Sequence, residues 1–228
     1  MLVASFPAVA LGTNCYVLAT KAGGECVVVD PGIEVDDQLH QVLTELSLTP
    51  TAVLLTHGHV DHVYSAARVG QDVPVYIHAD DRYRLTDPMA DLPAGMVAAF
   101  EQQLGRPTRW SEPATVVGLV DGQRLELAGL SIDVHHAPGH TQGSILLQLA
   151  DVPEGTDAEV ACTVLTGDVL FAGTIGRTDL SGGDHATMLR TLRDVVLALP
   201  DDALVLPGHG PATTMVRERA TNPFLQTF

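Results

Sequence analysis

The chain of 228 residues has few cysteines, few basic residues and no apolar run near the roughly 20 residues that a membrane helix needs. Its three cysteines, Cys15, Cys26 and Cys162, lack paired spacing such as Cys-x-x-Cys. This excludes a zinc ribbon and favours a reducing cytoplasm over a disulfide framework. The first basic residue is Lys21, so an export signal would lack its basic start. We therefore expect a cytoplasmic protein that does not bind membranes.

Acidic residues dominate the charge of the chain. Lys and Arg number 12 against 28 Asp and Glu, which gives a formal net charge of −16. Such a field repels phosphate backbones, so a nucleic-acid partner is not expected. Some of the carboxylates could belong to a cation site, although most should lie on a solvated surface. Hydrophobic residues make up 46% of the chain and no long polar linker divides it, so residues 1–228 are predicted to form a single domain.

Short apolar runs alternate with amphipathic stretches in both halves of the chain. Apolar runs bounded by turn residues predict strands at 14–20, 26–30, 52–55, 73–77, 130–134, 144–149, 160–165 and 204–206. Apolar residues spaced by three and four positions predict helices at 36–46, 60–69, 96–104 and 184–199. Strands and helices in both halves indicate an α/β layered fold.

The most informative stretch is Thr-His-Gly-His-Val-Asp-His at 56–62, which packs four potential metal ligands into seven residues after an apolar run. His57 and His59 are two positions apart, so their side chains leave the same face of an extended segment. Asp61 and His62 add a carboxylate and another imidazole at the following turn. These groups suit zinc, iron or manganese. A histidine-rich surface loop is the alternative, but the flanking sequence is apolar strand and glycine, not low-complexity sequence.

Three further candidate ligands follow predicted strands. They are His140 in Ala-Pro-Gly-His-Thr, Asp168 in Leu-Thr-Gly-Asp and His209 in Pro-Gly-His-Gly. Taken singly, each is as typical of a turn or a helix cap. Together with the first motif they make seven ligands at strand ends, where α/β folds gather functional groups. Seven are more than one ion requires and suit two ions that share a bridging carboxylate.

These four motifs, in this order, closely resemble those of the metallo-β-lactamase-fold hydrolases, and the match spans nearly the whole chain. Gly-Asp-Val-Leu-Phe at 167–171 and Gly-Arg-Thr-Asp-Leu at 176–180 are similar to the glyoxalase II-like branch, the hydroxyacylglutathione hydrolases and their short bacterial relatives. The resemblance implies an α/β (α+β) fold, the four-layer αββα sandwich, with two similar halves and the metals at one edge. It also implies a division of the ligands: His57, His59 and His140 on one ion, Asp61, His62 and His209 on the other, and Asp168 between them.

The implied activity is hydrolysis of a thioester, such as the 2-hydroxyacyl thioester S-lactoylglutathione, by a hydroxide that bridges two divalent metal ions. Zinc is expected, with iron or manganese as alternatives. Asp61 and Asp168 would be catalytic because they orient the hydroxide. Asp30, in an Asp-Pro-Gly turn, matches a family position that supports the ligands from behind, and it is equally typical of a turn. Arg177 could bind a substrate carboxylate, although we favour an internal ion pair with Asp179 or Asp184.

Other functions of the same superfamily stay open at this point. A persulfide dioxygenase would hold a single iron through His57, His140 and Asp168, and a lactonase would use the dinuclear site on ring esters. Glutathione and another low-molecular-weight thiol are both open as carriers, because the helical C-terminal region of full-length glyoxalase II has no counterpart here. Residues 80–107 are either a flap over the site or, as we prefer, a peripheral loop. Five histidines have no ligand context: His40, His78, His135, His136 and His185.

Overall fold

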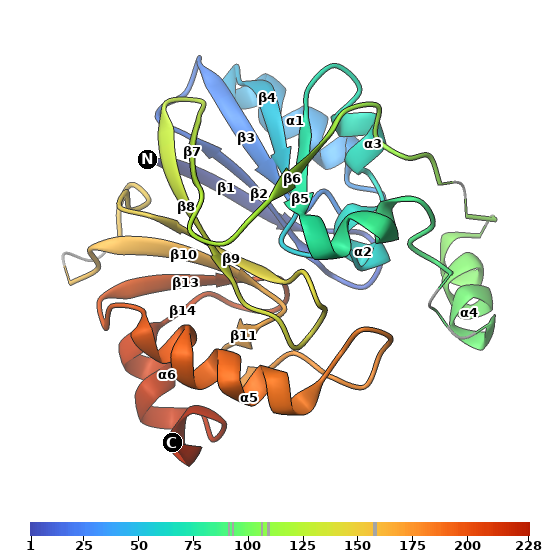
Figure 1. Cartoon of the computed structure of the whole chain (residues 1–228). Helices are drawn as coiled ribbons and strands as arrows, with labels where there is room; N and C mark the ends of the chain where they lie inside the picture. The colour runs from blue at the N-terminus through green and yellow to red at the C-terminus, as the bar shows by residue number, and fades with distance from the viewer. Residues whose placement is uncertain (91, 93, 106, 109, 157–158) are drawn as a thin grey trace.

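Two six-stranded β-sheets stack against each other in the computed structural model, which describes residues 1–90, 92, 94–105, 107–108, 110–156 and 159–228 (Figure 1). In spatial order the first sheet comprises β1 (Leu2–Pro7), β2 (Asn14–Ala19), β3 (Glu25–Val29), β4 (Thr49–Leu54), β5 (Val75–His78) and β6 (Val116–Leu119). The second comprises β14 (Thr213–Thr214), β13 (Ala203–Pro207), β10 (Cys162–Gly167), β9 (Ile145–Leu149), β8 (Leu130–His136) and β7 (Arg124–Leu127). A small hairpin joins β11 (Leu170–Phe171) to β12 (Thr174–Ile175).

Helices cover the outer face of each sheet. The first sheet packs against α1 (Asp36–Leu46), α2 (Val60–Val63) and α3 (Ala66–Val69), and the second against α5 (His185–Asp194) and α6 (Met215–Thr221). The remaining elements are α4 (Ala94–Leu104) and the 3-10 turns η1 (Ala79–Leu85), η2 (Val196–Ala198) and η3 (Leu225–Thr227). The expected four-layer αββα sandwich is therefore confirmed. Among the described residues, no helix has the length and apolar character to cross a membrane.

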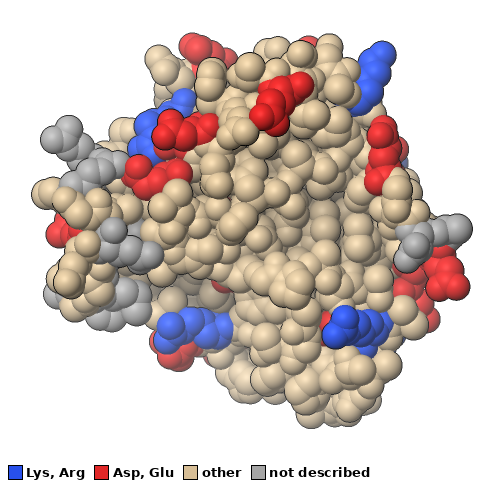
Figure 2. Space-filling view, turned by 180° about the vertical axis from the view of Figure 1, so that it is seen from behind, with Lys and Arg blue, Asp and Glu red and all other residues tan. Residues whose placement is uncertain are grey.

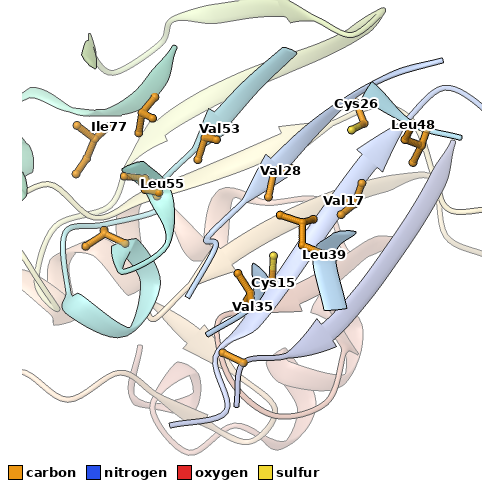
Figure 3. Close-up of a cluster of buried hydrophobic side chains, with 14 of the residues drawn as sticks. Cys15, Val17, Cys26, Val28, Val35, Leu39, Leu48, Val53, Leu55 and Ile77 are labelled. Carbon is orange, nitrogen blue, oxygen red and sulfur yellow. The ribbon is translucent and has the colours of Figure 1, made fainter. Parts of the chain in front are cut away.

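Strand β2 explains why the sequence shows apolar runs instead of alternation. Cys15 and Val17 belong to the cluster between the first sheet and its helices, whereas Tyr16 and Leu18 face the second sheet. Successive side chains of a strand point to opposite faces, and both faces of this strand are covered, so both sets must be apolar. Figure 3 shows the helix-facing set, where Leu39 of α1 lies against the row of strand side chains.

The buried thiols behave as apolar groups. Cys15, Cys26 and Cys162 are all free and buried, which agrees with the predicted absence of a disulfide framework. Burial raises the pKa of the Cys15 thiol strongly and that of Cys26 to about 12. These side chains are therefore uncharged at neutral pH and contribute packing to the core.

Two predicted helices are wrong in their extent. The segment 60–69 forms two short helices, α2 and α3, which are interrupted at Ser65. The hydroxyl of Ser65 donates to the Gly32 carbonyl at 2.6 Å and its backbone N–H to the Pro31 carbonyl at 3.0 Å. Because these bonds hold the segment against the turn after β3, they fix the position of the ligand-bearing first helix. The helix predicted at 184–199 likewise ends at Asp194, and η2 follows.

Charged side chains are unevenly spread over the face that Figure 2 shows. The view from behind shows a broad uncharged area, with acidic and basic side chains mainly around its margin (Figure 2). Several of the basic groups are paired, as Arg68 is with Asp36 and Arg124 with Asp133. Such exposed pairs contribute little to stability.

Candidate metal centre

Strand ends from both sheets meet at one edge of the sandwich. Strands β3 and β4 are parallel, as are β10 and β13, so within each pair the carboxyl ends lie at the same edge. Asp30 and His57 follow the first pair, and Asp168 and His209 follow the second. His140 enters from the loop that precedes β9. The layered fold thus brings together residues as far apart in the sequence as Asp30 and His209.

The first group consists of three imidazoles. His59 Nδ1 lies 3.1 Å from His57 Nε2 and 2.8 Å from His140 Nε2, and the latter two nitrogens are 3.2 Å apart. A tetrahedral zinc ion with nitrogen ligands at about 2.0 Å would hold those nitrogens about 3.3 Å apart. His140 Nδ1 donates to the Arg177 carbonyl at 2.7 Å, which leaves the lone pair of Nε2 facing the group. The three rings therefore point their nitrogens at a common position.

These imidazoles are neutral at pH 7. Burial, aided by nearby His140, lowers the pKa of His59 to about 3. Burial and the neighbouring histidines also hold the pKa of His57 well below its ordinary value, and burial lowers that of His140. Neutral imidazole is the form that binds a metal.

The second group adds carboxylates. Asp61 Oδ2 lies 3.1 Å from His209 Nε2 and 3.7 Å from His62 Nε2. Although burial opposes ionisation, His62 and His209 outweigh it and lower the pKa of Asp61. Burial also opposes protonation of His62, but Asp168, Asp61 and Asp30 together raise its pKa well above the ordinary value. Without a cation these carboxylates therefore favour a proton on His62, and a bound metal ion would replace that proton.

Asp168 lies between the two groups. Its Oδ1 is 3.3 Å from His62 Nε2, and its Oδ2 is 3.6 Å from both His140 Nε2 and His209 Nε2. One carboxylate therefore reaches ring nitrogens of both groups, which is the position of a bridging ligand between two cations.

The chemistry of these groups fits bound cations. His62 Nε2 and Asp168 Oδ1 are buried and have no hydrogen-bond partner, and such buried unpartnered polar atoms are costly and uncommon. Neutral imidazoles and ionised carboxylates are the donor set of zinc, iron and manganese sites. The seven side chains fall into the overlapping triads His57-His59-His140, His57-His62-Asp168 and Asp61-His62-His209.

Asp30 supports the site from behind. Its Oδ1 accepts the Thr56 N–H at 2.8 Å, and its Oδ2 accepts the Thr56 hydroxyl at 2.6 Å and His62 Nδ1–H at 2.9 Å. The last bond places the free lone pair of His62 on Nε2, toward the second group. Asp30 also has a φ of 49°, so it occupies a turn conformation as well.

Two further supporting residues were not anticipated from the sequence. Asp81 is fully buried; its Oδ2 accepts the Gly58 N–H at 2.8 Å and the Thr141 hydroxyl at 2.6 Å, and its Oδ1 accepts the Gly143 N–H at 3.0 Å. It therefore ties the loop of His57 and His59 to the loop of His140. Thr13 donates its hydroxyl to Asp61 Oδ2 at 2.9 Å. The sequence offered one sign that Asp81 could be functional: it comes shortly after the predicted strand at 73–77.

Position 208 requires glycine because there is no room for a side chain, and not because its backbone conformation is unusual. A Cβ atom at this position would collide with Asp168 Oδ1 and would lie 2.7 Å from His62 Cε1. The glycine of the Pro-Gly-His-Gly motif thus lets the backbone pass directly beside the second group.

A cavity of about 400 Å³ opens onto the metal-binding groups. Besides five of the candidate ligands, its lining includes Leu11, Val60, Leu92, Ala99, Arg177 and Leu180. Arg177 forms the expected internal pair, with Nε and Nη2 at 2.7 and 2.8 Å from the carboxylate oxygens of Asp179. Leu92 and Ala99 come from the segment 80–107, of which residues 91, 93 and 106 lie outside the described part of the chain.

Two histidines that lie outside the metal-binding motifs also lie close to each other. The rings of His78 and His136 stack at a centroid distance of 4.0 Å and an interplanar angle of 9°, beside Asp80. Nearly parallel rings do not aim their nitrogens at a common point. His136 Nε2 also donates to the Gln142 carbonyl at 2.7 Å. This trio is thus less suited to a metal ion than the seven side chains at the sheet edge.

Comparison with known proteins places this geometry in context. The family model of the metallo-beta-lactamase superfamily matches residues 8–153. A Mycobacterium tuberculosis (strain H37Rv) protein is 44% identical, covering 99% of this chain and 98% of its own. The hydroxyacylglutathione hydrolase GloC of Haemophilus influenzae is 33% identical, over 100% of this chain and 99% of its own.

Solved structures show the same fold. The BLEG-1 B3 metallo-beta-lactamase superposes with a TM-score of 0.80 at 34% identity, covering 98% of this chain and 99% of that one. TTHA1623, solved in a di-iron-bound form, superposes with a TM-score of 0.76 at 35% identity, covering 97% of this chain and 100% of that one.

Proposed function

Because the chain belongs to the metallo-β-lactamase superfamily, we propose that it is a hydrolase that uses two divalent metal ions to cleave a thioester. The observation that carries the proposal is that Asp168 lies within 3.6 Å of ring nitrogens of both ligand groups, beneath a cavity of about 400 Å³. The similarity to a hydroxyacylglutathione hydrolase supports the thioester as the substrate class. The wider family includes enzymes for other esters and amides, so the site geometry, and not the fold, must carry the assignment.

The metal ions would be held by His57, His59 and His140 on one side, by Asp61, His62 and His209 on the other, and by Asp168 between them. Bound there, they would supply a hydroxide at neutral pH and polarise the thioester carbonyl. Zinc remains our expectation for the metal, with iron or manganese as alternatives. The relative that was solved in a di-iron-bound form supports iron as an alternative.

The residues around these ligands would orient the reacting groups. Asp61 Oδ2 is held by the Thr13 hydroxyl, so the carboxylate is fixed in direction and can keep an attacking water aligned with the carbonyl. Asp168 would do the same from the opposite side. The departing thiolate has an ordinary pKa near 8.5 and is stable enough to leave without a general acid.

The dioxygenase alternative finds less support in the arrangement of side chains. It would need His57, His140 and Asp168 around one iron and would leave the group of Asp61, His62 and His209 without a role. A lactonase would use the same two-metal centre, and so it differs only in the substrate that the cavity admits.

The proposal is tested with S-lactoylglutathione and purified protein whose metal content is determined on the same sample. We expect turnover with about two metals per chain, and a loss of at least 100-fold in kcat for His59→Ala and Asp168→Ala. Val216→Asn, a change at an exposed position on α6, is the matched control and should keep full activity. Turnover at the wild-type rate in a fully metallated Asp168→Ala variant would contradict the assignment. Oxygen consumption by a protein with one iron would favour the dioxygenase.

A further inference from the structure

An exposed leucine at the mouth of the cavity has a strained backbone. Leu11 has a φ of 63° and its side chain is 54% exposed. Of the described non-glycine residues with positive φ, it alone carries a large apolar side chain. This conformation is unfavourable for a bulky residue. Because the exposed side chain gains little from burial in the fold, the strain points to a role outside the fold itself.

The loop that carries Leu11 is fixed to the metal-binding groups. Thr13, two positions along, donates to Asp61 Oδ2 and forms a β-bridge with His209. The Asn14 N–H donates to the Gly208 carbonyl at 2.7 Å. The Ala8 N–H donates to the Thr13 carbonyl at 2.7 Å and closes the loop at its base. Leu11 is therefore held at a set position relative to the ligands.

Apart from the metal-binding groups and Arg177, the lining of the cavity is apolar. Besides Leu11 it consists of Leu92, Leu180, Val60 and Ala99. Among the described lining residues, the single cation is Arg177, whose guanidinium is engaged by Asp179. The cavity thus offers apolar side chains as well as the metal-binding groups. An uncharged apolar chain would fit the apolar lining better than a carboxylate would.

Resting on the proposed thioesterase function, we propose that Leu11, with Leu92 and Leu180, forms a subsite for an apolar chain of the thioester substrate. The chain sits on either the acyl or the thiol side of the scissile bond. The enzyme then prefers thioesters with an apolar chain of several carbons over short ones. Leu11 determines this specificity, and its strain is tolerated because the side chain must face the substrate.

The test uses the metal-loaded protein and three uncharged thioesters: S-ethyl thioacetate, S-ethyl thiohexanoate and S-hexyl thioacetate. Hydrolysis releases a carboxylic acid and a thiol, and the thiol is measured. We expect kcat/KM to be roughly tenfold or more higher for at least one long ester than for the short ester. The ester that gains identifies the side on which the chain binds.

Leu11→Asn is the decisive variant, because asparagine has a similar size and tolerates positive φ. It should keep or raise the melting temperature and lower the preference for the long ester by roughly tenfold. Leu11→Gly is a second variant that relieves the strain and removes the side chain, with the same expected loss of preference. Val216→Asn, at another exposed apolar position (59% exposed), should leave the preference unchanged.

The outcomes separate the two proposals. Hydrolysis without any chain-length preference, or a preference that both Leu11 variants retain, would overturn the subsite while leaving the thioesterase function standing. No hydrolysis of these esters or of S-lactoylglutathione by protein with two metals per chain would reject the thioesterase function, and the subsite with it.

Discussion

The fully buried carboxylate of Asp81 offers a sharp test of how the ligand loops are positioned. It accepts hydrogen bonds from Gly58, Thr141 and Gly143, which lie within three positions of the ligands His59 and His140. In Asp81→Asn, the amide nitrogen replaces one oxygen. Whichever oxygen it replaces, the amide nitrogen faces the N–H of Gly58 or Gly143, and that donor loses its acceptor.

The size of the effect follows from these contacts. A buried donor left without a partner costs about 1–3 kcal/mol of folding free energy. The two ligand loops also lose their common anchor, and a change of this kind behind metal ligands typically lowers metal affinity by about 10–100-fold. We therefore expect Asp81→Asn to lose both stability and metal affinity. Urea unfolding of the metal-free protein measures the first, and competition with a chromophoric chelator measures the second.

Glu218→Gln is the matched control. Glu218 is also fully buried and accepts from Gly173 N–H at 2.8 Å, Thr213 Oγ1 at 2.7 Å and Asn222 Nδ2 at 2.9 Å, none of them next to a ligand. Asp81 also faces the buried guanidinium of Arg84, whose Nε lies 3.5 Å from Asp81 Oδ1, so Glu218→Gln should lose less stability than Asp81→Asn. It should keep its metal affinity. Equal losses of affinity in the two variants, or wild-type affinity in Asp81→Asn, would refute the positioning role.

Three further predictions concern the metals, a glycine and the thiols. Removing metal with EDTA should lower the melting temperature by about 5–10 °C, since a free ligand at 100 times Kd stabilises by about 2.7 kcal/mol; an unchanged melting curve would contradict bound metal. Gly208→Ala should reduce metal content because its Cβ collides with Asp168, whereas Gly24→Ala, whose Cβ meets only the Lys21 carbonyl at 3.7 Å, should not; equal metal content in both, measured by elemental analysis, would refute this. Native protein should react slowly with a thiol reagent because its three cysteines are buried, and unfolded protein should react at all three; rapid labelling of native protein would contradict the burial.

The sequence predicts the layers well, because β2, β3, β9, β10 and β13 are buried on both faces and read as apolar runs. β1, β6 and β7 were not anticipated, because their side chains are mostly only partly buried or exposed and their sequences lack a continuous apolar run bounded by turn residues. The two-residue strands β11, β12 and β14 are too short to show a pattern. The break between α2 and α3 depends on Ser65 bonding to residues more than 30 positions earlier, which local periodicity does not report.

The candidate ligands could be found because histidine and aspartate directly after an apolar strand and beside glycine are chemically distinctive. The residues that support these ligands could not be found from the sequence. Asp81 lies about 60 positions from Thr141 and Gly143, and Thr13 lies 48 positions from Asp61. A single aspartate or threonine has many ordinary roles, so only the folded arrangement identifies these residues. Asp30 was noticed through its motif, and the fold adds its bonds to Thr56 and His62.

The most direct test of the account is a crystal structure of the metal-loaded protein with anomalous diffraction. Two peaks roughly 3.5–4 Å apart are expected, one beside His57, His59 and His140 and one beside Asp61, His62 and His209, with Asp168 touching both. A single peak bound by His57, His140 and Asp168, with the second group empty at saturating metal, would contradict the two-metal hydrolase.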